Sequence, residues 1–182
     1  MGADPTLADV DQLMTLLAAA ERVTDSIVGG DSIGVLAHSL QCADVLLAER
    51  PDDSELQVAG LVHDIGDLLV PGDADGHGRH GARAVAGLLG PRVAALVELH
   101  VPAKRYLVTT DPAYRATLSR GSIRTLELQG GLLDDEAVAR FEAEPCAADA
   151  LVLRRADEAA KVPGRSVPGL STWRPVVELL AG

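Results

Sequence analysis

The sequence contains few aromatic residues, few cysteines and no long uninterrupted hydrophobic run. Only 2% of its 182 residues are aromatic although 47% are hydrophobic. Its core must therefore consist of Ala, Leu and Val, a mixture that favours helices over strands. The two cysteines, Cys42 and Cys146, match no zinc-binding spacing, and we interpret them as small apolar residues in a reducing compartment.

Basic residues are also scarce: 16 Lys and Arg stand against 27 Asp and Glu, so the formal net charge is -11. This charge argues against nucleic acid or an anionic membrane as a partner, since both attract basic surfaces. No apolar stretch approaches the roughly 18 residues that a membrane-spanning helix needs. The N-terminus has no basic region before an apolar run, as a signal peptide would. We therefore expect a cytoplasmic protein that contacts no membrane and is a monomer or a weak homo-oligomer.

Apolar residues recur every three or four positions along most of the chain, which indicates helices. We predict an all-α, compact helical bundle of about eight or nine helices that forms one domain over residues 1–182. An N-terminal helix is expected over about 6–28, a core over about 29–170 and a flexible tail over about 163–182. Asp31 or Ser32 can cap the second helix, and Ser54 with Gln57 resembles a capping box for the third. Pro102 is expected to end a short helix over 91–100.

The dipeptide His63-Asp64 lies at the predicted end of the third helix, in Gly-Leu-Val-His-Asp-Ile-Gly. Neighbouring helical residues point about 100° apart, so they seldom serve one small ligand. A pair of metal ions can use both residues, with the imidazole on one ion and the carboxylate bridging to the next. The dipeptide therefore predicts a dinuclear metal site.

The other ligands come from histidines and one late aspartate. We predict that Asp64 bridges two ions and that the full set of ligands is His38, His63, Asp64, His80, His100 and Asp157. Asp64, His80 and His100 would surround the ion with open positions and form the catalytic centre. Imidazoles and carboxylates without thiolate suit iron, manganese or zinc better than magnesium. The fifth histidine, His77, lies in a Gly-rich loop and is expected to be exposed to solvent.

Cationic and hydroxyl side chains lie at helical spacing from these ligands. Lys104 follows His100 by four residues, and Arg154 and Lys161 flank Asp157 by three and four. Ser122, Thr125 and Gln129 fall on one face of another predicted helix. In a strongly acidic chain, cations gathered around a metal site predict a small anionic substrate with phosphate-like oxygens.

The order H…HD…H…H…D resembles the HD-domain superfamily, whose members are helical metal-dependent phosphohydrolases and, in one branch, diiron oxygenases. His100-Val-Pro-Ala-Lys-Arg-Tyr-Leu107 and the run Leu128-Gln-Gly-Gly131 resemble that branch more specifically, the mixed-valent diiron oxygenases that cleave organophosphonates (the PhnZ type). This resemblance covers about residues 29–170. It implies two iron ions, Fe(II) and Fe(III), and phosphonate oxygens held by Lys104, Ser122, Thr125, Gln129 and Lys161.

The resemblance implies that O2 is used to break the C–P bond of a 1-hydroxyphosphonate similar to 2-amino-1-hydroxyethylphosphonate, giving a carboxylic acid and phosphate. The alternative is an HD phosphohydrolase that acts on a phosphate monoester or a nucleotide. A hydrolase would use the same ligands with Mn, Zn or Mg and a metal-activated water. A non-catalytic binding protein is the third interpretation.

Three positions depart from the pattern of that branch. Val28 stands where the branch usually has a tyrosine, and valine cannot bind iron. Asp31 stands where a glutamate is usual, and Asp67 where a histidine often faces the phosphonate. A carboxylate at position 67 repels a dianion unless it is protonated or paired. We predict that Asp31 and Asp67 both contact the substrate; the shorter Asp31 suits a different substrate tail, and Asp67 needs a partner such as an arginine or a substrate ammonium.

Overall fold

The computed structural model describes residues 6–23 and 33–182, and the regular elements in those ranges are all helices. The predicted all-α class is therefore confirmed. In chain order the elements are α1 (Val10–Ala19), a 3-10 turn (Ala20–Arg22), α2 (Val35–Glu49), α3 (Ser54–Val62), α4 (Ile65–Leu69), α5 (His77–Thr110), α6 (Pro112–Thr117), α7 (Arg120–Leu128), α8 (Asp135–Glu142), α9 (Ala147–Ala159) and α10 (Leu170–Ala181).

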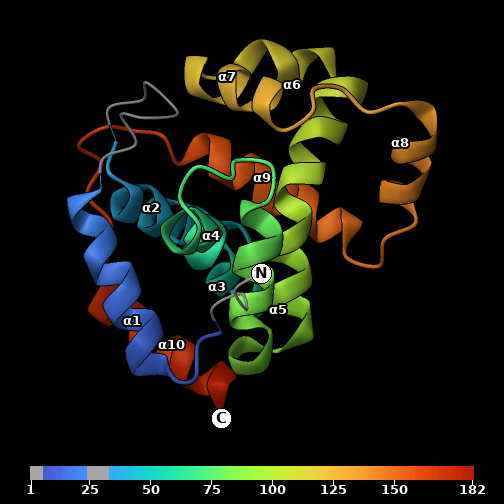
Figure 1. The fold of residues 1–182 in the computed structure, drawn as a ribbon. Coiled ribbons are helices and arrows are strands. Elements are labelled where there is room, and N and C mark those ends of the chain that lie inside the picture. Colours follow the sequence, from blue (N-terminus) through green and yellow to red (C-terminus); the bar gives the residue numbers. More distant parts are fainter. Residues whose placement is uncertain (1–5, 24–32) are drawn as a thin grey trace.

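Helix α5 is the central element, and α3, α4 and α9 pack against it. It is kinked at Gly90, whose φ of 85° is accessible mainly to glycine. Helices α1 and α10 pair on one side of the bundle, whereas α6 and α7 lie at the far end of α5 and α8 projects beside them (Figure 1). The main core is aliphatic, as the composition predicts, with fully buried Leu13, Leu46 and Leu96.

A second, smaller hydrophobic cluster joins the end of α5 to α6 and α7. Its buried members are Leu107, Val108, Tyr114, Leu118 and Leu126. Helix α7 is therefore anchored to the bundle by few apolar contacts, and its polar face is available for a site.

Pro102 lies inside α5, and the prediction that it ends a helix is wrong. Proline removes one hydrogen bond to the carbonyl of Glu98, four residues earlier. The helix continues because the residues on both sides, Val101 and Ala103, are buried in the core. It ends instead at Thr110, and the side chain of the next residue, Asp111, accepts the Tyr114 amide and caps α6.

The C-terminal segment is helical, so the predicted flexible tail over 163–182 is wrong for its second part. Residues 163–169 lack helical structure, but α10 follows and packs against α1, α3 and α5. Trp173 and Val177 are spaced by four residues and are both buried. The Pro- and Gly-rich stretch before them, together with Pro175 inside the helix, masked this spacing in the sequence.

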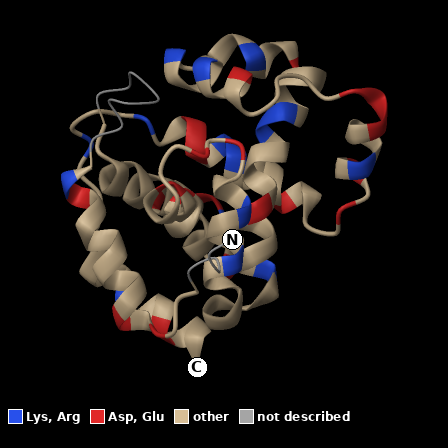
Figure 2. Cartoon of the chain, viewed as in Figure 1, with Lys and Arg blue, Asp and Glu red and all other residues tan. Residues whose placement is uncertain are grey.

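The helix starts use aspartates more than the sequence predicted. Asp53, not Ser54, caps α3 by accepting the Leu56 amide at 3.1 Å. The Gln57 side chain instead donates to the carbonyl of Arg50 at 2.7 Å. Asp134 caps α8, and Figure 2 shows the acidic residues that follow it at the start of that helix. Carboxylates at these ends stabilise the helices through the free amides and the helix dipole.

The N-terminal helix is shorter than the predicted range of 6–28. Helix α1 ends at Ala19, the 3-10 turn follows, and Val23 is extended. Helix α2 starts after Gly34, not after a polar cap. The predicted cap Asp31 and its neighbours Val28 and Ser32 lie outside the described residues.

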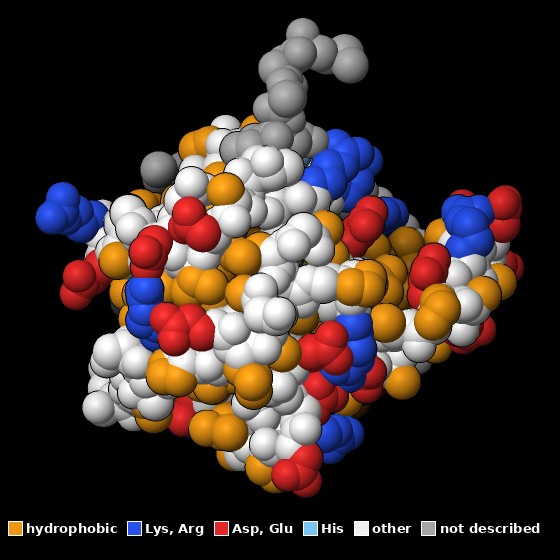
Figure 3. All heavy atoms as spheres, turned by 90° about the horizontal axis from the view of Figure 1, so that it is seen from below, with side chains coloured by type: hydrophobic (Ala, Val, Ile, Leu, Met, Phe, Trp, Pro, Cys, Tyr) orange, Lys and Arg blue, Asp and Glu red, His pale blue; other side chains and the backbone are white. Residues whose placement is uncertain are grey.

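By length and composition alone, α5 could cross a membrane. Half of its most apolar stretch is buried inside the fold, however, and the helix is kinked and packed against other helices. On the face shown in Figure 3, apolar side chains are interspersed with charged ones. These features are those of a core helix.

Candidate metal centre and anion pocket

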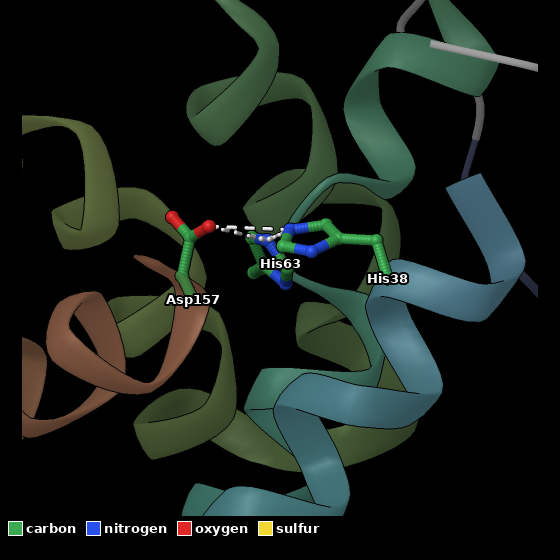
Figure 4. A group of neighbouring side chains, drawn as sticks. All are labelled: His38, His63 and Asp157. Carbon is green, nitrogen blue, oxygen red and sulfur yellow. Dashed lines mark hydrogen bonds and ion pairs between the residues drawn. The ribbon is translucent and has the colours of Figure 1, made fainter. Parts of the chain in front are cut away.

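Six ligand-type side chains from five helical elements meet beside α5. His38 comes from α2, Asp157 from α9, and His63 from the end of α3; they form one group (Figure 4). Asp64, His77 and His100 form a second group. Within each group the candidate ligand atoms lie within 4.8 Å of one another.

Asp64 connects the two groups because its carboxylate oxygens face opposite ways. Its Oδ2 lies 3.1 Å from Nε2 of His63 and 3.6 Å from Nε2 of His38. Its Oδ1 lies 3.5 Å from Nε2 of His77 and 3.6 Å from Nε2 of His100. The geometry is therefore that of a bridging carboxylate. Burial opposes ionisation of Asp64, but the surrounding histidines outweigh it and hold the pKa of this carboxyl well below its usual value.

Each of the four imidazoles is fixed by a backbone carbonyl on its far side. The Nδ1 atoms of His38, His63, His77 and His100 lie 2.6–3.1 Å from the carbonyl oxygens of Ala160, Gly60, Ala74 and Val97. A carbonyl can only accept, so each Nδ1 carries the proton. In a neutral ring, Nε2 then carries the lone pair and points to the centre, which is the usual arrangement of metal-binding histidines.

Burial keeps two of these rings neutral. It lowers the pKa of His38 to about 4 and that of His100 to about 3. For His77 burial acts the same way, but Asp64 and Asp67 prevail and raise its pKa.

The donor atoms are spaced as a metal ion requires. The Nε2 atoms of His38 and His63 are 3.2 Å apart, and those of His77 and His100 are 2.9 Å apart. His38 Nε2 also lies 3.2 Å from Oδ1 of Asp157. Two ligand atoms about 2.1 Å from one ion and at right angles are about 3.0 Å apart. Facing lone pairs repel each other, and a cation between them removes that repulsion, so these residues fit two metal ions.

The structure places two histidines differently from what the sequence led us to expect. His77, predicted to be exposed, is only 4% exposed and is a member of the second group. His80, predicted as a ligand, is in neither group, and its Nε2 lies 2.9 Å from Oδ2 of Asp73. Both lie in the first turn of α5, three residues apart, and the turn directs His77 toward the ligands. The Gly-rich surroundings of His77 gave a false signal of exposure.

Gly66 brings α4 against the start of α5. A Cβ at this position would lie 1.9 Å from the His77 carbonyl oxygen, so Gly66→Ala must displace the backbone that carries His77. We expect Gly66→Ala to lower stability by about 1–3 kcal/mol and to weaken metal binding, as measured by thermal unfolding and metal analysis. Gly87→Ala on α5 is the control, since a Cβ there meets nothing within 4 Å. Equal metal content in both variants would contradict this expectation.

A cavity of about 260 Å³ opens beside the two groups. Of the candidate metal ligands, its wall includes His38, Asp64, His77, His100 and Asp157. The structure places the described members of the predicted substrate set on the same wall: Asp67, Lys104, Ser122, Thr125, Gln129, Arg154 and Lys161. The helical spacings read from the sequence therefore converge on one cavity.

Lys104 is held inside this cavity by two residues of α7 and its end. Its Nζ donates to Oγ1 of Thr125 at 2.5 Å and to Oε1 of Gln129 at 2.9 Å. Burial, with repulsion from Arg154 and Lys161, lowers its pKa to about 6. An anion in the cavity would raise this pKa, because its charge stabilises the ammonium form of Lys104.

Arg154 is buried, and each of its three guanidinium nitrogens donates to an acceptor of the protein. Nε donates to the Tyr114 hydroxyl at 2.7 Å, Nη1 pairs with Asp157, and Nη2 donates to Glu158 at 2.5 Å. Lys161 donates to Oγ of Ser122 at 2.7 Å. Tyr114 and Glu158 were missed in the sequence, although Glu158 follows Asp157 directly and lies one turn after Arg154.

The HD domain family matches residues 32–160, which include the six candidate ligands and most of the cavity wall. The chain therefore belongs to the HD-domain family. Of the six residues that suggested this relationship, all except His80 meet at one place in the fold: His38, His63, Asp64, His100 and Asp157.

Two curated relatives are phosphonate dioxygenases. The hydroxymethylphosphonate dioxygenase of Gimesia maris is 38% identical over 157 residues, which are 81% of this chain and 78% of the relative. The glycine-betaine-forming 1-hydroxy-2-(trimethylamino)ethylphosphonate dioxygenase of Leisingera caerulea is 32% identical over 166 residues, 87% of this chain and 84% of the relative. The resemblance to the oxygenase branch of the family is thereby confirmed.

Proposed function

We propose that this protein is a diiron oxygenase that cleaves the C–P bond of a 1-hydroxyphosphonate with O2. The observation that carries the proposal is the position of Asp64, which faces a ligand group on each side at the wall of a cation-lined cavity. The two named relatives support the reaction type. Per turnover, the hydroxyphosphonate dianion and O2 would give a carboxylate, hydrogen phosphate and a proton.

Two iron ions would be held by His38, His63 and Asp157 on one side and by His77 and His100 on the other, with Asp64 shared. A bound iron pair would supply the redox chemistry that oxidative C–P cleavage requires. Backbone carbonyls fix the four imidazole donors beforehand, so little reorganisation of these rings accompanies binding. This ligand set uses His77 in place of His80.

The cavity would bind the phosphonate group through α7 and the residues facing it. Lys104 and Lys161 would offset its charge, and Ser122, Thr125 and Gln129 would offer hydrogen bonds. Arg154 would contribute charge and hold Ser122 and Asp157 in place, because each of its nitrogens already has an acceptor in the protein. Asp67 would face the remainder of the substrate, and we propose the same role for Asp31.

The proposal is tested by phosphate release from a panel of 1-hydroxyphosphonates, including hydroxymethylphosphonate and 2-amino-1-hydroxyethylphosphonate. Iron-loaded protein is assayed with and without O2, and the carboxylic acid is measured in parallel. We expect release that requires O2 and yields one acid per phosphate. Release of equal amount without O2, from these compounds or from phosphate monoesters, would instead indicate a hydrolase.

Binding of the phosphonate should be coupled to proton uptake by Lys104. Its pKa of about 6 in the free protein leaves it mainly neutral at pH 7.5. A neighbouring dianion raises that pKa, so the complex binds an additional proton and affinity falls as pH rises above about 6. Calorimetric titration with methylphosphonate in two buffers of different ionisation enthalpy measures the uptake directly.

Lys104→Met is the matched variant for this experiment, because methionine preserves much of the buried side-chain volume without a titratable group. We expect it to bind methylphosphonate at least about tenfold more weakly, since a charge-assisted contact is lost, and to take up less proton. Unchanged uptake in Lys104→Met would assign the proton to another group.

A further inference from the structure

The cationic part of the cavity wall, which we call the anion pocket, includes Ser122, Arg154 and Lys161. Glu158 contacts these three residues but is not itself part of the wall. It lies on α9 directly after Asp157, and its side chain is only 10% exposed. Its Oε2 accepts hydrogen bonds from Nη2 of Arg154 at 2.5 Å, from Oγ of Ser122 at 2.7 Å and from Nζ of Lys161 at 2.9 Å. Its Oε1 accepts the backbone amide of Ser119, the N-cap of α7, at 2.8 Å.

This set of donors is one that a phosphate oxygen would also attract: a guanidinium, an ammonium, a hydroxyl and a helix N-terminal amide. Three of the donors, from Ser122, Arg154 and Lys161, belong to the cavity wall, whereas Glu158 does not. The carboxylate therefore holds them from the side away from the cavity.

The donors are limited in number, so Glu158 and a bound anion draw on the same ones. Ser122 has a single O–H, which it donates to Glu158. Lys161 has three N–H groups, of which one goes to Glu158 and one to Ser122. The carboxylate of Glu158 forms ion pairs with two cations, Arg154 at 2.5 Å and Lys161 at 2.9 Å. Its negative charge thus lies next to the anion pocket.

We propose that Glu158 is an internal counter-anion that lowers the affinity of the pocket for phosphate-like anions. It satisfies Ser122, Arg154 and Lys161 in the free protein and repels an anion that approaches them. The affinity for the released phosphate is thereby kept low. The inference rests on the proposed function only in the choice of phosphate as the anion.

The test is the dissociation constant for inorganic phosphate, measured by calorimetry on iron-loaded protein. Glu158→Gln keeps the size of the side chain and removes the charge, and we expect about tenfold tighter binding from the loss of repulsion at short range. Glu127→Gln on the exposed face of α7 is the control for net charge, with an expected change of less than about twofold because solvent screens that charge.

Weaker or unchanged phosphate binding by folded Glu158→Gln would overturn the inference, because it would make Glu158 only a support for the pocket. Glu158→Asp gives a second test if the first variant does not fold. It withdraws the charge from Ser122 by one methylene, and we expect about threefold tighter binding. Weaker binding in this variant would also overturn the inference.

Phosphate binding requires neither O2 nor turnover, so the two proposals fail separately. Tighter binding in the variants without any O2-dependent cleavage would preserve the role of Glu158 and remove the proposed reaction. Cleavage of hydroxyphosphonates with weaker phosphate binding in the variants would do the reverse.

Discussion

Replacing His77 by glutamine should abolish phosphate release, whereas the same replacement at His80 should leave most of it. His77 Nε2 lies 3.5 Å from Oδ1 of Asp64 and 2.9 Å from Nε2 of His100, so its loss opens the second ligand group. We expect at least about a 100-fold loss of turnover, because even residues that only support metal ligands cost 10–100-fold. Bound iron should fall toward half of the wild-type amount.

The pair is well matched because both histidines lie in the first turn of α5. His80 is directed to Asp73, and glutamine can still donate to that carboxylate. Iron analysis and phosphate release are measured on both variants at equal folded fraction. If His80→Gln lost more iron and more phosphate release than His77→Gln, the ligand set predicted from the sequence, with His80, would be the correct one.

Asp64→Asn should be at least as damaging, because one residue serves both groups. Its two oxygens lie 3.1–3.6 Å from the Nε2 atoms of four histidines, and the amide removes both the charge and one of the oxygens. We expect a loss of turnover of at least about 100-fold and loss of magnetic coupling between the ions. Iron content and electron paramagnetic resonance of the partly oxidised protein measure these effects.

Asp44→Asn is the control for loss of one aspartate. Asp44 pairs with Arg165 at the surface, 2.8 Å from Nη2, and such pairs contribute at most about 1 kcal/mol. Its iron content and turnover should stay near those of the unchanged protein. Retention of a coupled iron pair in Asp64→Asn would show that another group bridges the ions.

The sequence predicted the fold class and most of the site because these depend on local periodicity. Apolar residues at helical spacing and the scarcity of aromatics indicated an aliphatic helical bundle. The same periodicity put Lys104 one turn after His100, and put Arg154 and Lys161 about one turn to either side of Asp157. A helix preserves such relations wherever it packs, so the structure finds all of them on one cavity wall.

Other features depended on contacts between distant segments. Pro102 breaks an isolated helix, but burial of its neighbours holds α5 together. Residues 170–181 look like a tail until Trp173 and Val177 meet the core. In each case tertiary packing outweighs a local preference of a few kcal/mol.

The sequence by itself predicted a helical protein with candidate metal ligands and cationic residues beside them, because residue types and their spacing along helices carry that information. Only the tertiary structure decided that His77 and not His80 completes the second ligand group, and that Glu158 holds the pocket from behind. The direction of a side chain in the first turn of α5 is set by the close packing of Gly66 against His77. Arg154 and Lys161 are within one turn of Glu158, but its contacts with Ser119 and Ser122 depend on the approach of α7 to α9. The contact of Gly66 with His77 and those of Glu158 with α7 join separate elements, so no spacing rule along a single helix could reveal them.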